Sequence, residues 1–375
     1  MNPLNRRTFL GRGVQAAGLV GLAAWPVRGA AVGAPDVDEL VGKAVNFLRP
    51  RQADDGSWSG DRKEPGITAL VATALLRSGR VTADEPAVSK ALAYLEKFLG
   101  PKGGLSEAAH ANYATSVALM AFHEANKGGR YASIIKGGQD FLKTMQWDEG
   151  EDKGRDNAFY GGAGYGGKNS RPDLSNTAFM IEALRDTGLP PDDPALQKAL
   201  VFVSRCQNLK GEFNDQPWAD KVNDGGFVYT AANGGSSVAG KTENGGLRSY
   251  ASMTYAGLKS MIHAGLTADD PRVKAAHAYV ARHYTLDENP GLGQRGLYYY
   301  YQTFAKSLAL LGKPAFTDAS GKEHDWKADL VSALAKRQDA SGGWVNRTDG
   351  FMEGDANLVT AYGLLALASV RSAKA

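Results

Sequence analysis

The chain has 375 residues, of which 43% are hydrophobic, so it is long enough to bury a sizeable core. Its formal net charge is +3, but the first 34 residues hold four arginines and no acid, so the remainder carries 3 − 4 = −1. This near-neutral balance, without a basic stripe, gives no electrostatic support for binding nucleic acid.

The first 34 residues have the pattern of an export signal. A twin-arginine motif that contains Arg6 and Arg7 precedes a mildly apolar stretch from Gly13 to Val27, and small residues follow up to Ala34. We expect export by the twin-arginine route, to the periplasm or the cell exterior. An amphipathic helix with a chance arginine pair is the alternative. The stretch is too short and too rich in Gly and Ala to predict a membrane span.

From residue 36 onward a helical segment recurs that begins with Lys and a small residue and continues to an aromatic residue. Apolar residues at spacings of three and four predict a helix in each copy. These helices also carry Lys, Glu and Asp, so we place them on the outside of the fold. The copies lie at 43–48, 90–95 and 198–203, with looser ones at 136–142 and 274–280 and a degenerate one at 328–336.

Each of these segments is followed by a Gly-rich loop and a second helix. The second helices are nearly all apolar or small, which is typical of a buried helix, and many end in Gly. The sequence therefore predicts one all-α domain over residues 36–375, an (α/α)6 toroid in which six inner helices are surrounded by six outer ones. The inner segments are 67–77, 113–124, 174–186, 249–263, 297–311 and 357–370.

A Gln-x3-Gly-x-Trp motif occurs twice, from Gln52 to Trp58 and from Gln338 to Trp344. Two copies near opposite ends of the chain indicate an internal repeat. The motif resembles the QW repeat of squalene and oxidosqualene cyclases, whose terpenoid cyclase-like toroid is shared by the β subunits of protein prenyltransferases. Residues 159–165 and 171–179 also look like this superfamily. The resemblance implies structural and not catalytic roles for both Gln and both Trp residues.

Cyclases of this kind use an Asp-x-Asp-Asp motif whose middle Asp donates a proton. The matching stretch here starts at Asp173, and the position of the acid is Ser175. A Ser hydroxyl cannot protonate an alkene, because a general acid needs a labile proton and a suitable pKa. Asp173 is therefore the candidate catalytic residue, with a helix N-cap as the alternative role. We expect Ser175 and Asn176 to face the cavity and bind substrate.

Prenyltransferase β subunits bind zinc through Asp, Cys and His. The corresponding positions here, after residues 224–227, carry other residues, and none of the six His residues has the spacing of a metal-ligand pair. The single Cys206 rules out an intramolecular disulfide and is predicted to pack in the core. We predict no metal site and no cofactor.

Two long insertions, at 148–170 and 208–248, lie within the third and fourth helix pairs. The loops within the pairs of a toroid fall on one face, and long loops on a rigid scaffold often carry function. We therefore place the substrate site at this mouth, near Asp173 and Asn176, with Arg248, Tyr250, Tyr298 and Tyr301 as further binding residues. Tyr298 and Tyr301 share a helix face, either as cation-stabilising rings or as core.

Three functions fit these observations. The first is an exported protein that binds or acts on an isoprenoid or other apolar lipid, as an isomerase, lyase or transferase if it is active. The second is a non-catalytic interaction toroid, which a collapsed cavity would favour. The third is a polysaccharide-active toroid, which would need two carboxylates roughly 5–10 Å apart across the cavity. The sequence does not support peripheral membrane association, and it leaves the oligomeric state open.

Overall fold

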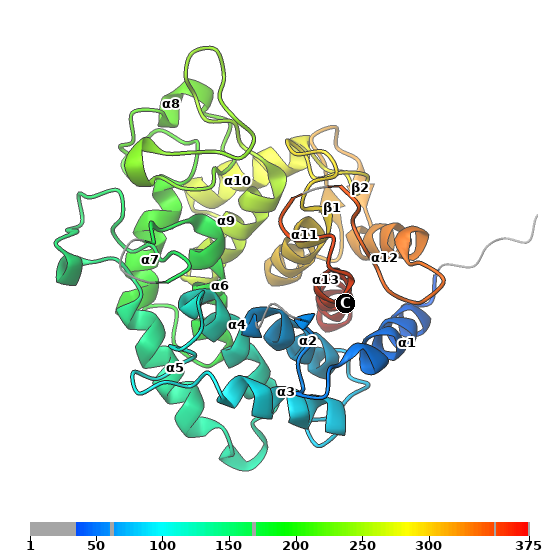
Figure 1. The fold of residues 1–375 in the computed structure, drawn as a ribbon. Helices are drawn as coiled ribbons and strands as arrows, with labels where there is room; N and C mark the ends of the chain where they lie inside the picture. The colour runs from blue at the N-terminus through cyan, green and yellow to red at the C-terminus, as the bar shows by residue number, and fades with distance from the viewer. Residues whose placement is uncertain (1–34, 61–63, 167–169, 349, 374–375) are drawn as a thin grey trace, which may run out of the picture. The chain divides into compact units, whose positions relative to one another are not determined.

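The computed structural model describes residues 35–60, 64–166, 170–348 and 350–373. The predicted export signal lies outside these residues, and residues 35–375 form one compact unit that is described by itself below. Six helices of this unit form an inner ring in which each contacts the next and the last contacts the first. In ring order they are α2 (Pro65–Arg77), α4 (Ala111–Glu124), α6 (Leu174–Asp186), α9 (Ala251–His263), α11 (Leu297–Leu311) and α13 (Ala356–Ser372) (Figure 1).

Six further helices surround the inner ring and pack on it (Figure 1). They are amphipathic, and each buries an apolar stripe against its inner partners. The prediction of an all-α toroid of six helix pairs is therefore confirmed. The outer helices are α1 (Val37–Leu48), α3 (Pro86–Glu96), α5 (Ala132–Thr144), α7 (Pro194–Arg205), α10 (Pro271–Arg282) and α12 (Trp326–Arg337).

The remaining regular structure lies in the connections. An antiparallel pair of short strands, β1 (Phe316–Thr317) and β2 (Glu323–His324), joins α11 to α12. The short helix α8 (Ala219–Val222) lies in the second long insertion. Single 3₁₀ turns are η1 (Arg49–Arg51), η3 (Lys127–Gly129), η4 (Glu149–Glu151) and η5 (Ala232–Gly234).

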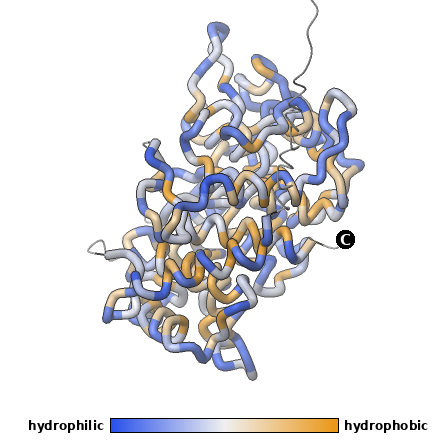
Figure 2. The backbone as a smooth tube through the Cα atoms, turned by 90° about the vertical axis from the view of Figure 1, so that its right-hand side faces the viewer, coloured by the Kyte–Doolittle hydropathy of each residue, from blue (hydrophilic) through white to orange (hydrophobic). Residues whose placement is uncertain are grey.

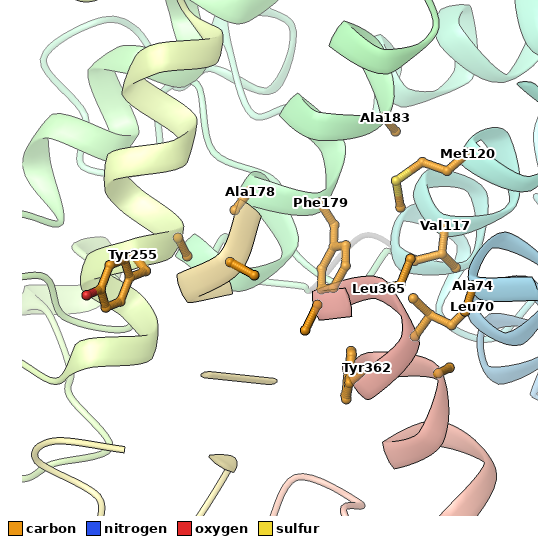
Figure 3. Packing of buried hydrophobic residues seen from close by; sticks show 14 of the residues in the cluster. Leu70, Ala74, Val117, Met120, Ala178, Phe179, Ala183, Tyr255, Tyr362 and Leu365 are labelled. Carbon is orange, nitrogen blue, oxygen red and sulfur yellow. The ribbon is translucent and has the colours of Figure 1, made fainter. Parts of the chain in front are cut away.

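The inner helices are buried on nearly every side because they contact two ring neighbours and the outer layer. Leu70 and Ala74 of α2 lie beside Val117 and Met120 of α4 in the core, and all four side chains are buried (Figure 3). The small side chain of Ala74 lets the two neighbouring helix backbones approach closely. Coloured by hydropathy, the backbone is hydrophobic mainly along the helices and hydrophilic mainly in the loops (Figure 2).

The two Gln-x3-Gly-x-Trp motifs connect neighbouring helix pairs. Gln52 Nε2 donates to the carbonyl of Gly56 in its own loop (2.9 Å) and to that of Ala87 in the first turn of α3 (2.7 Å). Gln338 Nε2 donates to Gly342 in its own loop (2.9 Å) and to Leu40 in α1 (2.9 Å). The second motif thus joins the last helix pair to the first and helps to close the ring.

The Trp of each motif fixes its loop to the preceding outer helix. Trp58 Nε1 donates to the carbonyl of Leu48 at the end of α1 (2.8 Å), and Trp344 Nε1 donates to Leu334 in α12 (2.9 Å). Both indoles are buried. These contacts are structural, in keeping with the role that the resemblance implies.

Two more Gln residues make the same pair of bonds. Gln146 Nε2 donates to Gly161 (2.8 Å) and to Ala195 at the start of α7 (2.9 Å). Gln207 Nε2 donates to the carbonyl of Gly225 (2.9 Å) and to that of Arg272 in the first turn of α10 (2.9 Å). Here the Gln and Gly are 15 and 18 residues apart instead of 4, because the long insertions separate them.

The Gly of each connection cannot be replaced without displacing the backbone. Gly342 has φ +93°, and a Cβ there would lie 2.6 Å from the carbonyl oxygen of Lys43. Gly56 has φ +94°, and a Cβ there would lie 2.4 Å from the carbonyl oxygen of Lys90. A left-handed conformation together with contact to a helix carbonyl requires Gly at these positions.

Candidate functional site

A cavity of about 800 Å³ opens where the first turns of the six inner helices converge. This volume is in the range of cavities that hold small organic ligands. Aromatic and aliphatic side chains dominate its wall, among them Ile67, Phe179, Met253 and Leu358. Six tyrosines also line it: Tyr113, Tyr165, Tyr229, Tyr250, Tyr299 and Tyr362.

Ring-to-ring contacts connect the tyrosines across the inner helices. Tyr113 of α4 meets Phe179 of α6 edge to face, with centroids 5.2 Å apart, and Tyr299 of α11 meets Tyr362 of α13 at 5.9 Å. The hydroxyls of Tyr113 and Tyr362 interact with each other. Burial raises the pKa of both phenols above the usual value of 10, so they stay neutral near pH 7.

Asp173 lies behind this wall as the N-cap of α6. Its Oδ1 accepts from the backbone N–H of Asn176 (2.9 Å), its Oδ2 accepts from Asn176 Nδ2 (2.8 Å), and the hydroxyl of Tyr229 also interacts with the carboxylate. Burial raises the pKa of Asp173 to about 6, although these hydrogen bonds and the charge of Arg171 oppose the shift. Asp173 is thus a helix cap that titrates close to neutral pH.

Ser175 and Asn176 both line the cavity, as expected, while Asp173 does not. The Ser175 hydroxyl lies 3.2 Å from the hydroxyl of Tyr299. At the position where the cyclases of the resemblance carry their acid, this chain therefore has the Ser175 alcohol, which is paired with the Tyr299 phenol. Neither group is acidic enough to protonate an alkene.

Of the other predicted binding residues, the structure places only Tyr250 on the wall. Tyr298 and Tyr301 contact each other edge to face at 5.7 Å, and the Tyr301 hydroxyl donates to the carbonyl of Leu286 (2.5 Å), so both belong to the core. Arg248 is exposed, and its Nε donates to the carbonyl of Lys241 (3.1 Å).

The residue of this tyrosine run that faces the cavity is Tyr299. The prediction that Tyr298 and Tyr301 share a face was right, but that face points away from the cavity. Each step along a helix rotates the side chain by about 100°, and nothing local to the sequence fixes which step points inward.

Two of the most important wall residues, Tyr165 and Tyr229, were not among the sequence candidates. Both come from the long insertions that were expected to form the mouth. The Tyr165 hydroxyl contacts Tyr229 and Asn176, and Tyr229 contacts Asp173, so the four side chains form one polar network. The insertions were the sequence signal for both residues, and Tyr165 also ends the stretch 159–165 that resembles the superfamily.

The rim of the cavity is partly apolar. Tyr165, Phe351 and Met352 line the cavity and are also 45%, 47% and 48% exposed. Beside them Glu64 faces His110, with Oε2 and Nδ1 3.3 Å apart. Among the described residues of the wall, Glu64 is the only carboxylate.

A second buried carboxylate, Glu353, lies near the mouth but not on the wall. Its Oε1 accepts from the backbone N–H groups of Tyr298 (2.9 Å) and Tyr299 (2.8 Å), so it caps α11 from a loop. Its Oε2 accepts from Asn346 (2.7 Å). Glu353 is thus used to hold the start of α11 in place.

One helical turn beyond Phe179, charged side chains fill the ring. Glu182 of α6 and Lys259 of α9 are both buried and form an ion pair of 2.5 Å. Lys306 and Arg77 lie 3.4 and 3.8 Å from the same carboxylate. Burial lowers the pKa of nearby His263 to about 4, so its ring is neutral. The polar cluster marks the end of the apolar lining.

The described residues contain no group of three or more His, Cys, Asp or Glu side chains arranged to hold a metal ion. Cys206 is buried, as predicted, and burial raises the pKa of its thiol. No helix in the described part of the chain combines the length and the apolar character needed to cross a membrane.

Comparison with known proteins finds no matching family model and no match among curated sequences. Solved structures share the fold. The type II terpene cyclase MstE from Scytonema matches with a TM-score of 0.56 at 14% identity, over 90% of this chain and 99% of that one. A glycosyl hydrolase of family 88 from Bacteroides vulgatus matches with a TM-score of 0.53 at 10% identity, over 90% and 99%. At these identities the likeness shows the α/α toroid fold and nothing finer.

Proposed function

We propose that this protein binds an isoprenoid, or a lipid of similar size and polarity, in the cavity at the start of the inner helices. The observation that carries the proposal is an open cavity of about 800 Å³ whose wall consists mainly of aromatic and aliphatic side chains. Burying a ligand's apolar surface there contributes roughly 25 cal/mol per Å² before the costs of association. A collapsed cavity would have favoured an interaction protein instead.

The similar structures are compatible with such a ligand. One solved structure is of an MstE variant in complex with its substrate, geranylgeranyl dihydroxybenzoate, a molecule with a long isoprenoid chain. The cavity of the present protein lies at the start of the inner helices and has the aromatic character that suits a chain of this kind. The likeness supports the ligand class and leaves the reaction open.

The same geometry does not favour the two catalytic alternatives. Proton transfer of the usual cyclase type would need an acid at the wall, where this chain has Ser175. Glycoside hydrolysis would need two facing carboxylates. The described wall contributes Glu64 alone, and that group pairs with His110. We therefore propose binding as the function and assign no reaction.

The experiment is native mass spectrometry of the mature protein purified from its exporting host, followed by titration with a C20 polyprenyl compound. Met253→Trp should weaken binding, because Met253 lies on the wall and an indole there reduces the space for ligand. Phe213→Trp is the control, since Phe213 is 39% exposed and outside the cavity.

A co-purified lipid, or binding that Met253→Trp weakens and Phe213→Trp leaves intact, would support the proposal. A protein that carries no lipid and binds no polyprenyl compound would overturn it. A rise in melting temperature with oligosaccharides alone would support the polysaccharide alternative.

We also propose that export delivers the protein to its site of action. The support is the twin-arginine motif around Arg6 and Arg7, and the chain's single Cys fits a domain that is stable without disulfides in an oxidising compartment.

A further inference from the structure

The amide of Asn176 is held in one orientation at the cavity wall. The residue is 1% exposed, and its Nδ2 donates to Asp173 Oδ2 at 2.8 Å while its backbone N–H donates to Oδ1 at 2.9 Å. Turning the amide over would place Asn176 Oδ1 against the carboxylate oxygen, and two acceptors at that distance repel each other. The carboxylate therefore fixes which amide atom is left without a partner.

The atom that remains is Asn176 Oδ1, which is buried and has no hydrogen-bond partner. Buried polar atoms in folded proteins are nearly always hydrogen-bonded, and each exception needs an explanation. Of the described side chains that line the cavity, Asn176 is the only one with a buried atom of this kind. Other buried unpaired atoms, such as the Tyr255 hydroxyl, belong to residues away from the wall.

The neighbouring hydroxyls do not supply the missing donor. Ser175 lies against Tyr299, and the hydroxyl of Tyr229 interacts with the Asp173 carboxylate. Tyr165 contacts Asn176, but Oδ1 stays without a donor. Because Asn176 lines the cavity, a ligand that fills the cavity is the candidate source of a donor for this acceptor.

We propose that the ligand carries a hydrogen-bond donor, a hydroxyl or an N–H, which binds Asn176 Oδ1 while its apolar body lies against the tyrosine and aliphatic wall. The preferred ligand class is then an isoprenoid alcohol, phenol or amide and not a hydrocarbon. This inference rests on the proposed function, since it assigns a polar group to the same ligand. A site built to hydrogen-bond a hydroxyl discriminates strongly against analogues that lack it, because the buried partner is left unpaired.

The test compares two probes on the mature protein, geranylgeraniol and its methyl ether. They share the C20 chain and an oxygen atom, but the ether has no proton to donate. We expect the alcohol to bind about tenfold more tightly, which is the effect of one hydrogen bond to a buried acceptor. Isothermal titration calorimetry at pH 8, where Asp173 is ionised and holds the amide in place, measures both affinities.

Asn176→Leu removes the acceptor and keeps most of the volume, so it should bring the two affinities together by weakening the alcohol alone. Ser252→Ala is the matched control, because Ser252 also lines the cavity but its hydroxyl already accepts from Asn289 Nδ2 (3.1 Å). That variant should keep the preference for the alcohol. If Asn176→Leu does not fold, the ratio in the wild-type protein decides by itself.

Equal affinities for alcohol and ether in the wild-type protein would overturn the inference and leave the proposed function standing, with a bound water serving Oδ1. A preference for the alcohol that survives in Asn176→Leu would also overturn it, because the donor would then be recognised elsewhere. If neither probe binds, the proposed function fails and this inference fails with it.

Discussion

Replacing Asp173 by Asn should change how the stability of the protein depends on pH. Burial raises the pKa of Asp173 from an ordinary value of 3.8 to about 6. Between these values the folded protein binds more protons than the unfolded chain, so the free energy of unfolding falls as pH rises. A raised carboxyl pKa thus stabilises the fold fully below about pH 3.8, and this contribution is lost as pH rises through about 6.

The size of the effect follows from the shift. A difference of about two pKa units at about 1.4 kcal/mol each makes the ionised carboxyl cost about 3 kcal/mol at pH 8. Asn cannot ionise, and it is as good an N-cap as Asp. The free energy of unfolding of Asp173→Asn, minus that of the wild type, should therefore rise by about 2–3 kcal/mol between pH 4 and pH 8. Altered hydrogen bonds to Asn176 would shift this difference by the same amount at every pH and would not change how it varies with pH.

Urea denaturation followed by circular dichroism at several pH values measures this difference. Asp270→Asn is the matched control. Asp270 caps α10, and its hydrogen bonds with Arg272 hold its pKa below the ordinary value. Its contribution to stability is present above pH 3.8 and lost as pH falls below that value, so the difference between this variant and wild type should stay nearly constant between pH 4 and pH 8. A flat or falling difference for Asp173→Asn would refute the assignment of a raised pKa.

Two further predictions concern the buried ion pair and the N-terminal segment. Glu182→Gln should lower the free energy of unfolding by about 3–5 kcal/mol, because it leaves the Lys259 ammonium buried without its carboxylate. Lys259→Met should lower it less, since Glu182 keeps two other cations nearby. Denaturation curves that rank the two variants in the opposite order would contradict this reasoning. Replacing both Arg6 and Arg7 by Lys keeps the charge but should leave the precursor in the cytoplasm, and continued export in cell fractionation would show that another signal is used.

The fold could be predicted from the sequence because its signals are local. Apolar spacing marks a helix, Asp193-Pro194 and Asp270-Pro271 start α7 and α10 with a capping Asp and a Pro at the first position, and the Gly-rich loops separate the pairs. Six such pairs with buried second helices leave a closed ring as the arrangement that hides every apolar face. The motif at Gln338 also indicated a repeat, although the two widely spaced copies at Gln146 and Gln207 could not be recognised without the structure.

The site depended on tertiary structure. Whether Tyr298 or Tyr299 faces the cavity depends on the rotation of α11, which the loop carboxylate of Glu353 helps to hold in place from 55 residues away. The pKa of Asp173 depends on how much solvent its neighbours exclude, and Tyr229 reaches Asp173 from a later insertion whose length was its only sequence signal. Periodicity along a chain determines which residues form a helix, whereas desolvation and hydrogen-bond pairing are properties of the space that distant segments enclose together.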